Sequence, residues 1–304
     1  MERRNLQLFD TASLYFRAFF GLPSSLRAQD GQSVNAVRGL LDFMARFITD
    51  YRPTHAAACW DNSWRPAWRV DLVPSYKAHR VLAGTVEVVP DELSPQVPLI
   101  LAVLGSLGIT VVGADDFEAD DVIGTLATHA GIPVDVITGD RDLFQLVDDE
   151  REVRVLSVVK GVRNHEVMTD TALIAKYGIG GAGYADFATL RGDASDGLPG
   201  VSGIGEKTAA RLIADHGDLE GVLAAAPAKR LSPALTARLT AGIPYLGPAR
   251  EVVRVRTDVP LEVTLDDLVL PTAPVQPEVF AELAELLNLG GAADRILAAL
   301  ALNA

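Results

Sequence analysis

Short apolar runs recur along the chain, and several of them end in an acidic residue. The run LQLF precedes Asp10, HAAACW precedes Asp61, and VDVIT precedes a glycine and then Asp140. A fourth run, ITVV, leads into the acidic loop GADDFEADD. Runs of this length with β-branched members predict strands that are buried on both faces of a sheet.

Helical spacing fills the intervals between these runs. After Ser33, a predicted N-cap, apolar residues recur at steps of three and four over residues 34–48 and make one helix face. Residues 95–107 and 118–129 predict two further helices. Strands that alternate with helices predict the α/β class, with a mostly parallel sheet flanked by helices on both faces.

The predicted sheet would gather acidic residues at one edge. Parallel sheets bind their ligands beyond the carboxyl ends of the strands. Asp10, Asp61, Asp140 and Asp142 all follow such ends, although they lie far apart along the chain. We therefore expect their side chains to lie close together in the folded protein.

The pattern changes near residue 180. Residues 178–205 are rich in glycine, and the chain beyond them is rich in alanine and leucine and mostly helical in pattern. Three prolines are expected to break its helices: Pro227, Pro233 and Pro244. We expect two parts, an α/β core over residues 1–180 and a helical region over residues 181–304.

Composition narrows the setting of the protein. The chain has 304 residues, of which 49% are hydrophobic, yet no uninterrupted apolar stretch approaches the roughly 18 residues of a membrane span. The N-terminus lacks the apolar core of a secretion signal. The single cysteine, Cys59, lies in an apolar run and is expected to be a buried thiol. These features favour a cytoplasmic protein.

Nine acidic residues are the candidate metal ligands: Asp10, Asp61, Glu118, Asp120, Asp121, Asp140, Asp142, Asp193 and Asp196. Each of them alone fits a helix cap or a turn, but nine like charges at one edge would repel one another unless cations neutralised them. Oxygen ligands without cysteine or histidine indicate Mg²⁺ or Mn²⁺. Two such ions about 4 Å apart are suited to the hydrolysis of a phosphodiester.

The net charge of −13 argues against a surface that binds nucleic acid non-specifically. The field at a site depends on its local charges, however, and divalent ions held by clustered acids reverse its sign. The overall charge therefore does not exclude a nucleic-acid substrate at the acidic edge.

A glycine-rich hairpin follows the last of these acids. The segment GLPGVSGIGEKTAA over residues 197–210 predicts a tight turn between helices, with backbone amides that face a phosphate at a helix N-terminus. Lys207 adds a positive charge. The alternative is a structural joint between two helices, which the preceding acidic GDASD disfavours.

Residues 62–92 are locally basic and carry interleaved aromatic side chains. The residues concerned are Trp64, Arg65, Trp68, Arg69, Tyr76, Lys77, His79 and Arg80. This mixture suits single-stranded DNA, which needs phosphate contacts and stacking surfaces, and the alternative is an ordinary solvated loop. Arg17, beyond the first strand, is either a further phosphate contact or a surface residue.

In this order, the motifs resemble the 5′-nuclease (flap endonuclease) family, which includes the N-terminal domain of bacterial DNA polymerase I. The resemblance runs from about Leu6 to Leu261, and it rests on LFD, the Asp61 to Pro66 segment, YKAHR, EADD, TGDRD and GDASDGLPGVSGIGEKTA. It implies a PIN-like fold with a helical arch over residues 62–92 and a helix–three-turn–helix hairpin over residues 197–215. No polymerase region follows residue 304, so the chain resembles the stand-alone members.

The resemblance also implies roles for the nine acids, which would hold two or three Mg²⁺ or Mn²⁺ ions. The first site would consist of Asp10, Asp61, Glu118 and Asp120. The remaining ligands would be Asp121, Asp140, Asp142, Asp193 and Asp196.

The same resemblance implies contacts with the substrate. Lys77 and Arg80 of the arch would grip the scissile phosphate and act in catalysis, and Arg17 would contact this phosphate from the other side. The carbonyl groups of Val201 and Ile204 would bind a K⁺ ion that holds duplex DNA. Further DNA contacts would come from Arg65, Tyr76, Gly203, Gly205, Lys207 and Thr208.

The activity that the resemblance implies is that of a structure-specific 5′-nuclease, an exonuclease and flap endonuclease of DNA replication and repair. It would act as a monomer on 5′ flaps, nicks and single-strand/double-strand junctions and leave a 5′-phosphate and a 3′-hydroxyl. A PIN-type ribonuclease, a non-catalytic DNA-junction-binding protein and a small-molecule phosphohydrolase are the alternatives. The hairpin after Asp196 argues against the ribonuclease, because cutting single-stranded RNA does not need a duplex anchor.

Overall fold

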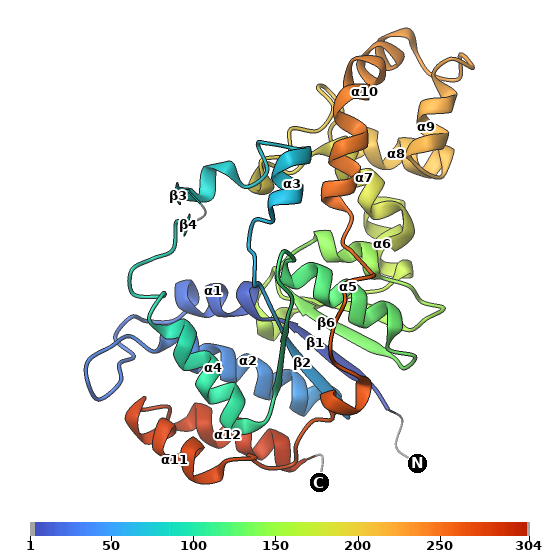
Figure 1. The fold of residues 1–304 in the computed structure, drawn as a ribbon. Helices are drawn as coiled ribbons and strands as arrows, with labels where there is room; N and C mark the ends of the chain where they lie inside the picture. Colours follow the sequence, from blue (N-terminus) through green and yellow to red (C-terminus); the bar gives the residue numbers. More distant parts are fainter. Residues whose placement is uncertain (1–3, 85, 303–304) are drawn as a thin grey trace.

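The computed structural model describes residues 4–84 and 86–302. Its centre is a six-stranded sheet in the order β5-β2-β1-β6-β7-β8, in which all neighbours are parallel except β7 and β8 (Figure 1). The strands are β1 (Leu6–Asp10), β2 (His55–Trp60), β5 (Thr110–Gly113), β6 (Val134–Thr138), β7 (Val153–Ser157) and β8 (Glu166–Met168). The predicted α/β class with a mostly parallel sheet is confirmed.

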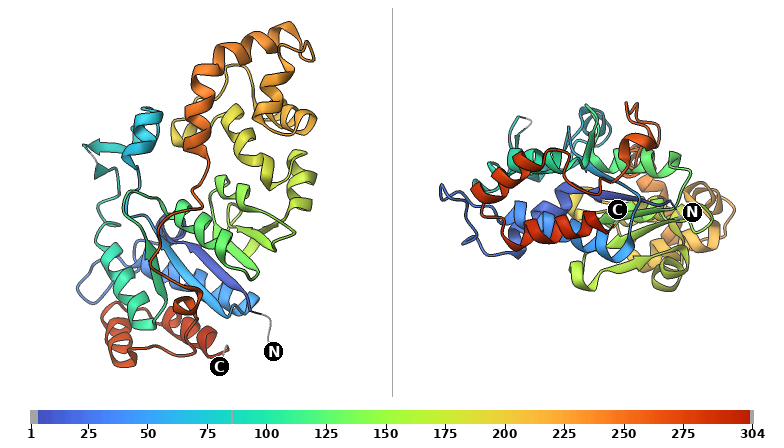
Figure 2. Two further views of the ribbon diagram at one scale, coloured as in Figure 1. Left: turned by 45° about the vertical axis from the view of Figure 1, so that its right-hand side comes forward. Right: turned by 90° about the horizontal axis from the view of Figure 1, so that it is seen from below.

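Helices cover both faces of this sheet (Figure 2). Successive side chains of a strand point to opposite faces, so Phe9 and Ile137 pack in one core while Leu8 and Val136 pack in the other. The helices on the side of Phe9 are α1 (Thr11–Gly21), α2 (Asn35–Tyr51) and α4 (Gln96–Leu107). The opposite core contains α5 (Ala119–His129) and the 3-10 turn η2 (Asp142–Leu146). This double cover explains the continuous apolar runs of the strands.

The three predicted helices of the core are α2, α4 and α5. The predicted cap of α2 is wrong, because the helix begins after Val34 and the Ser33 hydroxyl donates to Asn35 Oδ1 at 3.1 Å. The buried Gln96 side chain supplies the missing acceptor, since its Oε1 lies 2.8 Å from the backbone nitrogen of Ala36. A contact across sixty residues thus replaces a local cap.

A helical region stands above the carboxyl edge of the sheet (Figure 1). It consists of α6 (Asp170–Tyr177), α7 (Tyr184–Arg191), α8 (Glu206–His216), α9 (Leu219–Ala225) and α10 (Pro233–Val253), with the 3-10 turns η4 (Gly181–Gly183) and η5 (Ala194–Asp196). Buried Asp186 joins these helices, because it accepts bonds from Arg250 Nε at 2.6 Å, Arg250 Nη2 at 2.7 Å and the backbone nitrogen of Leu219 at 2.9 Å. Pro244, predicted as a break, lies inside α10.

The end of the chain leaves the helical region and returns to the core. The 3-10 turn η6 (Leu265–Leu268) leads to α11 (Pro277–Leu286) and α12 (Gly291–Ala301), which pack beneath α2 and α4 (Figures 1 and 2). Phe280, Leu289 and Ile296 are buried in the same core as Phe9. We predicted that residues 265–302 belong to the helical region, but they pack on the α/β core. Their apolar faces bury the outer sides of α2 and α4. In the described part of the chain, every helix is too short or too polar to cross a membrane.

The segment over residues 62–92 projects from the sheet edge toward the helical region (Figure 1). It contains the short helix α3 (Ala67–Leu72), the 3-10 turn η1 (Ala78–Arg80), an antiparallel pair of β3 (Val81–Ala83) and β4 (Val86–Glu87), and connecting loops. The expected helical arch is thus mostly non-helical. Pro66, Pro74 and Pro90 interrupt the segment, and proline cannot continue a helix.

Candidate active site

The carboxyl ends of three adjacent strands carry the first acids of the site. Asp10 ends β1, Asp61 follows β2 and Asp140 follows β6, and β1 lies between the other two strands. Asp10 is buried and caps α1, since its Oδ1 lies 3.2 Å from the backbone nitrogen of Ser13. Thr138 donates its hydroxyl to Asp10 Oδ2 at 2.5 Å. The side chain of Asp10 is therefore held in one orientation.

The N-terminus of α5 adds Glu118 and Asp120 to the same edge. Glu118 is the buried cap of this helix, and Asp61 Oδ1 accepts a bond from the backbone nitrogen of Ala119 at 2.7 Å. This bond joins the end of β2 to the start of α5. The four residues expected at the first metal site therefore meet at one edge of the sheet.

Loops from both parts of the chain supply the other acids. Asp140 Oδ1 lies 2.8 Å from the backbone nitrogen of Asp142, and Asp193 Oδ1 lies 2.8 Å from that of Ser195. Asp196 follows in the turn η5 of the helical region. One carboxylate oxygen of Asp142, Oδ1, is buried without a hydrogen-bond partner. A buried acceptor without a donor is costly unless a cation or water satisfies it.

Burial and, after it, charge repulsion among these acids raise several of their pKa values. Burial raises the pKa of Asp10 to about 7, and the charges of Asp61 and Asp140 add to the increase. Burial, followed by the charges of Asp140 and Asp10, raises the pKa of Asp120 well above its usual value. Burial and then the charges of Asp140, Asp196 and Asp193 have the same effect on Asp142. The two groups of acids therefore form one charge-coupled site.

The donor set fits hard divalent cations. All of its donor atoms are carboxylate oxygens, which Mg²⁺ and Mn²⁺ prefer. A bound cation would also give the unpartnered Asp142 Oδ1 a partner. Among the described residues, no three acidic, histidine or cysteine side chains already stand in a ready-made metal cage. The carboxylates are close enough to affect one another electrostatically, and their side chains would have to move closer together to coordinate an ion.

Asp121 departs from the expected ligand set. Its side chain is fully buried and pairs with Arg69 through two bonds, of 2.8 Å to Nη1 and 2.7 Å to Nη2. It also accepts bonds from the backbone nitrogens of Glu118 at 3.2 Å and Arg256 at 2.8 Å. Because both of its oxygens are paired with the buried guanidinium of Arg69, the geometry assigns Asp121 to the anchoring of α5. The other eight acids remain the expected ligands.

Two cations of the projecting segment lie against the acids. Lys77 Nζ lies 2.9 Å from Glu118 Oε2, and Arg80 Nη2 lies 3.0 Å from Asp196 Oδ1. Burial alone would lower the pKa of Lys77, but the charges of Glu118, Tyr76, Asp196 and Asp61 together outweigh it and raise that pKa well above the usual value. The backbone nitrogen of Lys77 also donates to the Asp196 carbonyl at 2.9 Å, so the segment is joined to the helical region at this point.

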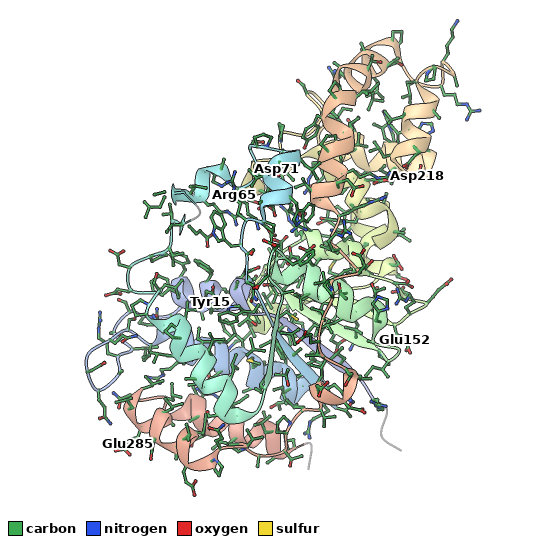
Figure 3. All side chains as sticks on the ribbon, in the orientation of Figure 1. Tyr15, Arg65, Asp71, Glu152, Asp218 and Glu285 are labelled. Carbon is green, nitrogen blue, oxygen red and sulfur yellow. The ribbon has the colours of Figure 1, made fainter. Side chains whose placement is uncertain are left out.

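The other substrate contacts expected in this segment have different roles in the structure. Tyr76 is buried, and its hydroxyl donates to Glu118 at 2.9 Å, so its ring cannot stack on a base in this conformation. Arg65 bonds to the carbonyls of Tyr76 at 2.6 Å and Pro74 at 3.1 Å, which closes the loop on itself. Figure 3 shows Arg65 above Tyr15, with the segment between the sheet edge and the helical region.

Arg17 lies on α1 behind the strand end that carries Asp140. A methyl group added at Gly139 would stand 3.4 Å from Arg17 Nη2, so the guanidinium packs against this glycine. Its Nε is buried without a partner, and burial lowers its pKa. The position of Arg17 beside Gly139 is compatible with the expected phosphate contact, which stays a prediction.

The glycine-rich hairpin forms a tight turn before α8. Gly203 has φ of +75°, a conformation that favours glycine, and Gly205 is the N-cap of α8. The side chains of Val201 and Ile204 are buried, while Lys207 is exposed at the start of the helix. The carbonyl of Val201 already accepts the Ile204 amide at 2.9 Å, and that of Gly203 accepts Arg238 Nη1 at 2.8 Å.

Two residues of the site were not singled out from the sequence. Thr138 donates its hydroxyl to Asp10, and its hydroxyl oxygen accepts a bond from the backbone nitrogen of Asp140 at 2.8 Å. Its position as the last residue of a strand before GD is a usable signal. Arg69 was counted among the basic residues expected to face DNA, and nothing local in the sequence distinguishes it from Arg65.

Solved structures with a similar fold include a flap endonuclease and other proteins bound to DNA. The structure of the D15 flap endonuclease of bacteriophage T5 with DNA and metal ions aligns with a TM-score of 0.65 at 17% identity, over 98% of this chain and 100% of that one. The catalytic core of Rad2 with a DNA substrate aligns with a TM-score of 0.60 at 16% identity, over 98% of this chain and 93% of that one. The fold is therefore that of the flap endonuclease class.

Sequence comparison gives the family. Two models match in succession, the 5′-3′ exonuclease N-terminal resolvase-like domain over residues 5–178 and the 5′-3′ exonuclease C-terminal SAM fold over residues 179–276. A 5′-3′ exonuclease of Streptomyces coelicolor is 58% identical over 96% of this chain and 99% of its own length. A 5′-3′ exonuclease of Mycobacterium tuberculosis is 47% identical over 98% of each chain. The chain belongs to the 5′-3′ exonuclease family.

DNA polymerase I contains a related segment. The enzyme of Mycobacterium bovis is 43% identical over 86% of this chain, which corresponds to 28% of the polymerase. The resemblance to the 5′-nuclease domain of that polymerase is thereby confirmed.

Proposed function

We propose that this protein is a structure-specific 5′-nuclease that hydrolyses DNA phosphodiesters at 5′ flaps, nicks and single-strand/double-strand junctions. The observation that carries the proposal is the convergence of eight carboxylates from both parts of the chain, with the pKa values of Asp10, Asp120 and Asp142 all raised. Such a group is stable in its ionised form only beside cations. The products would be a 5′-phosphate and a 3′-hydroxyl.

Mg²⁺ or Mn²⁺, two or three ions in all, would be held by two sets of carboxylates. The sets are Asp10, Asp61, Glu118 and Asp120, and Asp140, Asp142, Asp193 and Asp196. When bound, such ions lower the pKa of a water molecule and neutralise the charge that develops on the leaving oxygen. Within each set, hydrogen bonds from the backbone and from Thr138 fix the direction of the oxygens.

The side chains of Lys77 and Arg80 would position the scissile phosphate. Both lie against the carboxylates in the structure and would exchange these partners for the phosphate when the acids are neutralised. Arg17 would approach from α1. A phosphate with these contacts is held in line for attack, which contributes through orientation and charge stabilisation.

The hairpin before α8 would hold the duplex through its backbone. Gly203 and Gly205 precede the helix and Thr208 lies in its first turn, where the helix dipole favours a phosphate. The carbonyls of Val201 and Ile204 would bind a K⁺ ion between the protein and the DNA. These contacts carry no base specificity, so the enzyme would recognise the form of its substrate.

Cleavage assays on three substrates test this function. We expect Mg²⁺-dependent cutting of a labelled 5′-flap duplex, complete loss in EDTA and recovery when Mn²⁺ is added. Single-stranded RNA and free nucleotides should remain intact under the same conditions. Preferred cleavage of RNA would support the PIN-type ribonuclease instead, and binding of the flap without cutting in any divalent metal would support a junction-binding protein.

Lys207 should contribute to affinity and not to chemistry. The logarithm of the DNA association constant falls linearly with the logarithm of the salt concentration. We expect Lys207→Ala to reduce the magnitude of this slope by about 1, because one phosphate contact is lost. The cleavage rate at saturating DNA should not change. Lys160→Ala, which removes an exposed lysine from the turn after β7, is the control and should leave the slope as it is. An unaltered slope in Lys207→Ala would exclude this role.

A further inference from the structure

Arg69 is a charged side chain in the interior of the protein, next to the acidic site but not itself one of its carboxylates or expected phosphate contacts. It is 2% exposed and the largest fully buried side chain in the described part of the chain. Its guanidinium lies 4.5 Å from the ring centroid of Trp68 and 5.9 Å from that of Tyr76. Burying a guanidinium is costly unless its partners are fixed and correctly oriented, so these partners define what it does.

The guanidinium joins three segments that lie far apart in the sequence. Nη1 and Nη2 bind both oxygens of Asp121 on α5, and Nε donates to the carbonyl of Val252 at the end of α10 at 3.1 Å. Arg69 itself lies on α3, at the base of the projecting segment. The returning chain is bound a second time, because the backbone nitrogen of Arg256 donates to Asp121.

The hydrogen bonds of Arg69 and Asp121 extend to Glu118 of the acidic site. Asp121 Oδ2 accepts the backbone nitrogen of Glu118, and Arg69 Nη1 lies 3.6 Å from Glu118 Oε2. Tyr76, which packs near the guanidinium, donates its hydroxyl to the same carboxylate. A hydrophobic cluster of Val73, Tyr76, Ala249 and Val252 seals the junction between α3 and α10.

We propose that Arg69 is a positioning residue for metal binding, which fixes Glu118 and the start of α5 against α3 and the end of α10. Its planar guanidinium would fix the position of Glu118, one of the first set of metal-binding carboxylates, relative to the helical region that would bind duplex DNA. Hydrogen-bonding partners behind metal ligands typically contribute 10–100-fold to metal affinity. This inference rests on the proposed metal-dependent function, and it adds a residue that touches neither metal nor substrate.

The test is the affinity for Mn²⁺ in the absence of DNA, measured from the electron paramagnetic resonance signal of free Mn²⁺. Arg69→Lys keeps the charge but loses the planar fork, and we expect its Mn²⁺ affinity to fall 10–100-fold. The control is Arg250→Lys. Arg250 binds the buried carboxylate of Asp186 through two nitrogens in the same way, but lies in the helical region. It should lose thermal stability while it keeps the wild-type Mn²⁺ affinity.

The outcomes separate this inference from the proposed function. Equal Mn²⁺ affinities of Arg69→Lys and Arg250→Lys, within about twofold, would overturn the positioning role. A wild-type protein without Mn²⁺ binding would overturn the metal site itself.

Should Arg69→Lys fail to fold, the double variant Arg69→Met/Asp121→Asn removes both buried charges together and keeps an oxygen acceptor for the amide of Glu118. Reduced Mn²⁺ affinity in this variant supports the proposal. Wild-type affinity in it contradicts the proposal.

Discussion

Asp142→Asn should reduce cleavage of a 5′-flap duplex by about 10³-fold, because a metal ligand supports several kcal/mol of transition-state stabilisation and each 1.4 kcal/mol is tenfold in rate. The variant should nevertheless fold. In the metal-free protein it should even melt at a higher temperature than wild type, because the change removes the charge of a buried carboxylate that Asp140, Asp196 and Asp193 also repel. Loss of activity together with gain of stability distinguishes a ligand from a structural acid.

The matched control is Asp294→Asn, which neutralises an exposed acid in the first turn of α12, away from the sheet edge. It should cleave at the wild-type rate and melt normally. Cleavage assays with Mg²⁺ and thermal melts in EDTA would be compared for wild type and both variants. Near-normal cleavage by Asp142→Asn, or by Asp10→Ala tested beside it, would refute the site.

The stability of the metal-free protein should increase as pH falls from 8 toward 5. The folded-state pKa of Asp10 is raised from 3.8 to about 7, and those of Asp120 and Asp142 are also raised. Between these folded values and the unfolded value, the folded protein binds more protons than the unfolded chain. Stability therefore falls as pH rises through the folded pKa values, with a slope of about 1.4 kcal/mol per pH unit for each group that titrates.

Divalent ions should reverse this dependence, because they compete with protons for the same oxygens. Urea denaturation from pH 5 to pH 8 in EDTA and in Mg²⁺ would measure both slopes, and Asp10→Asn should flatten the slope in EDTA. A metal-free protein whose stability is constant or rises over this range would contradict the charge-coupled site.

Local sequence patterns were sufficient to predict β1, β2, β5 and β6 and the helices α2, α4 and α5, but they did not single out α1, β7 or β8. β-Branched runs and three-to-four spacing depend on which faces are buried, and both faces of β1, β2 and β6 are buried in the structure. They also placed Asp10, Asp61 and Asp140 correctly, because the carboxyl ends of neighbouring parallel strands meet at one edge. The family and its activity followed from the order of the motifs.

Long-range partners decided what the patterns could not. The EADD motif gave no means of separating Asp120, which faces the other acids, from Asp121, which pairs with an arginine 52 residues away. Tyr76 in an aromatic and basic segment fits a stacking surface equally well whether its ring is exposed or buried under Glu118. The helices after residue 265 have ordinary apolar stripes, and a stripe does not specify which surface it will cover.

The sequence by itself determined four of the six strands of the sheet, three core helices, the acids at the strand ends and hence the class of chemistry, because each depends on residues close together in the chain. The tertiary structure alone decided which acids are neutralised by arginine, how the projecting segment folds and where the last two helices pack. Those outcomes depend on the mutual approach of side chains from distant segments, where desolvation and charge pairing select the partner.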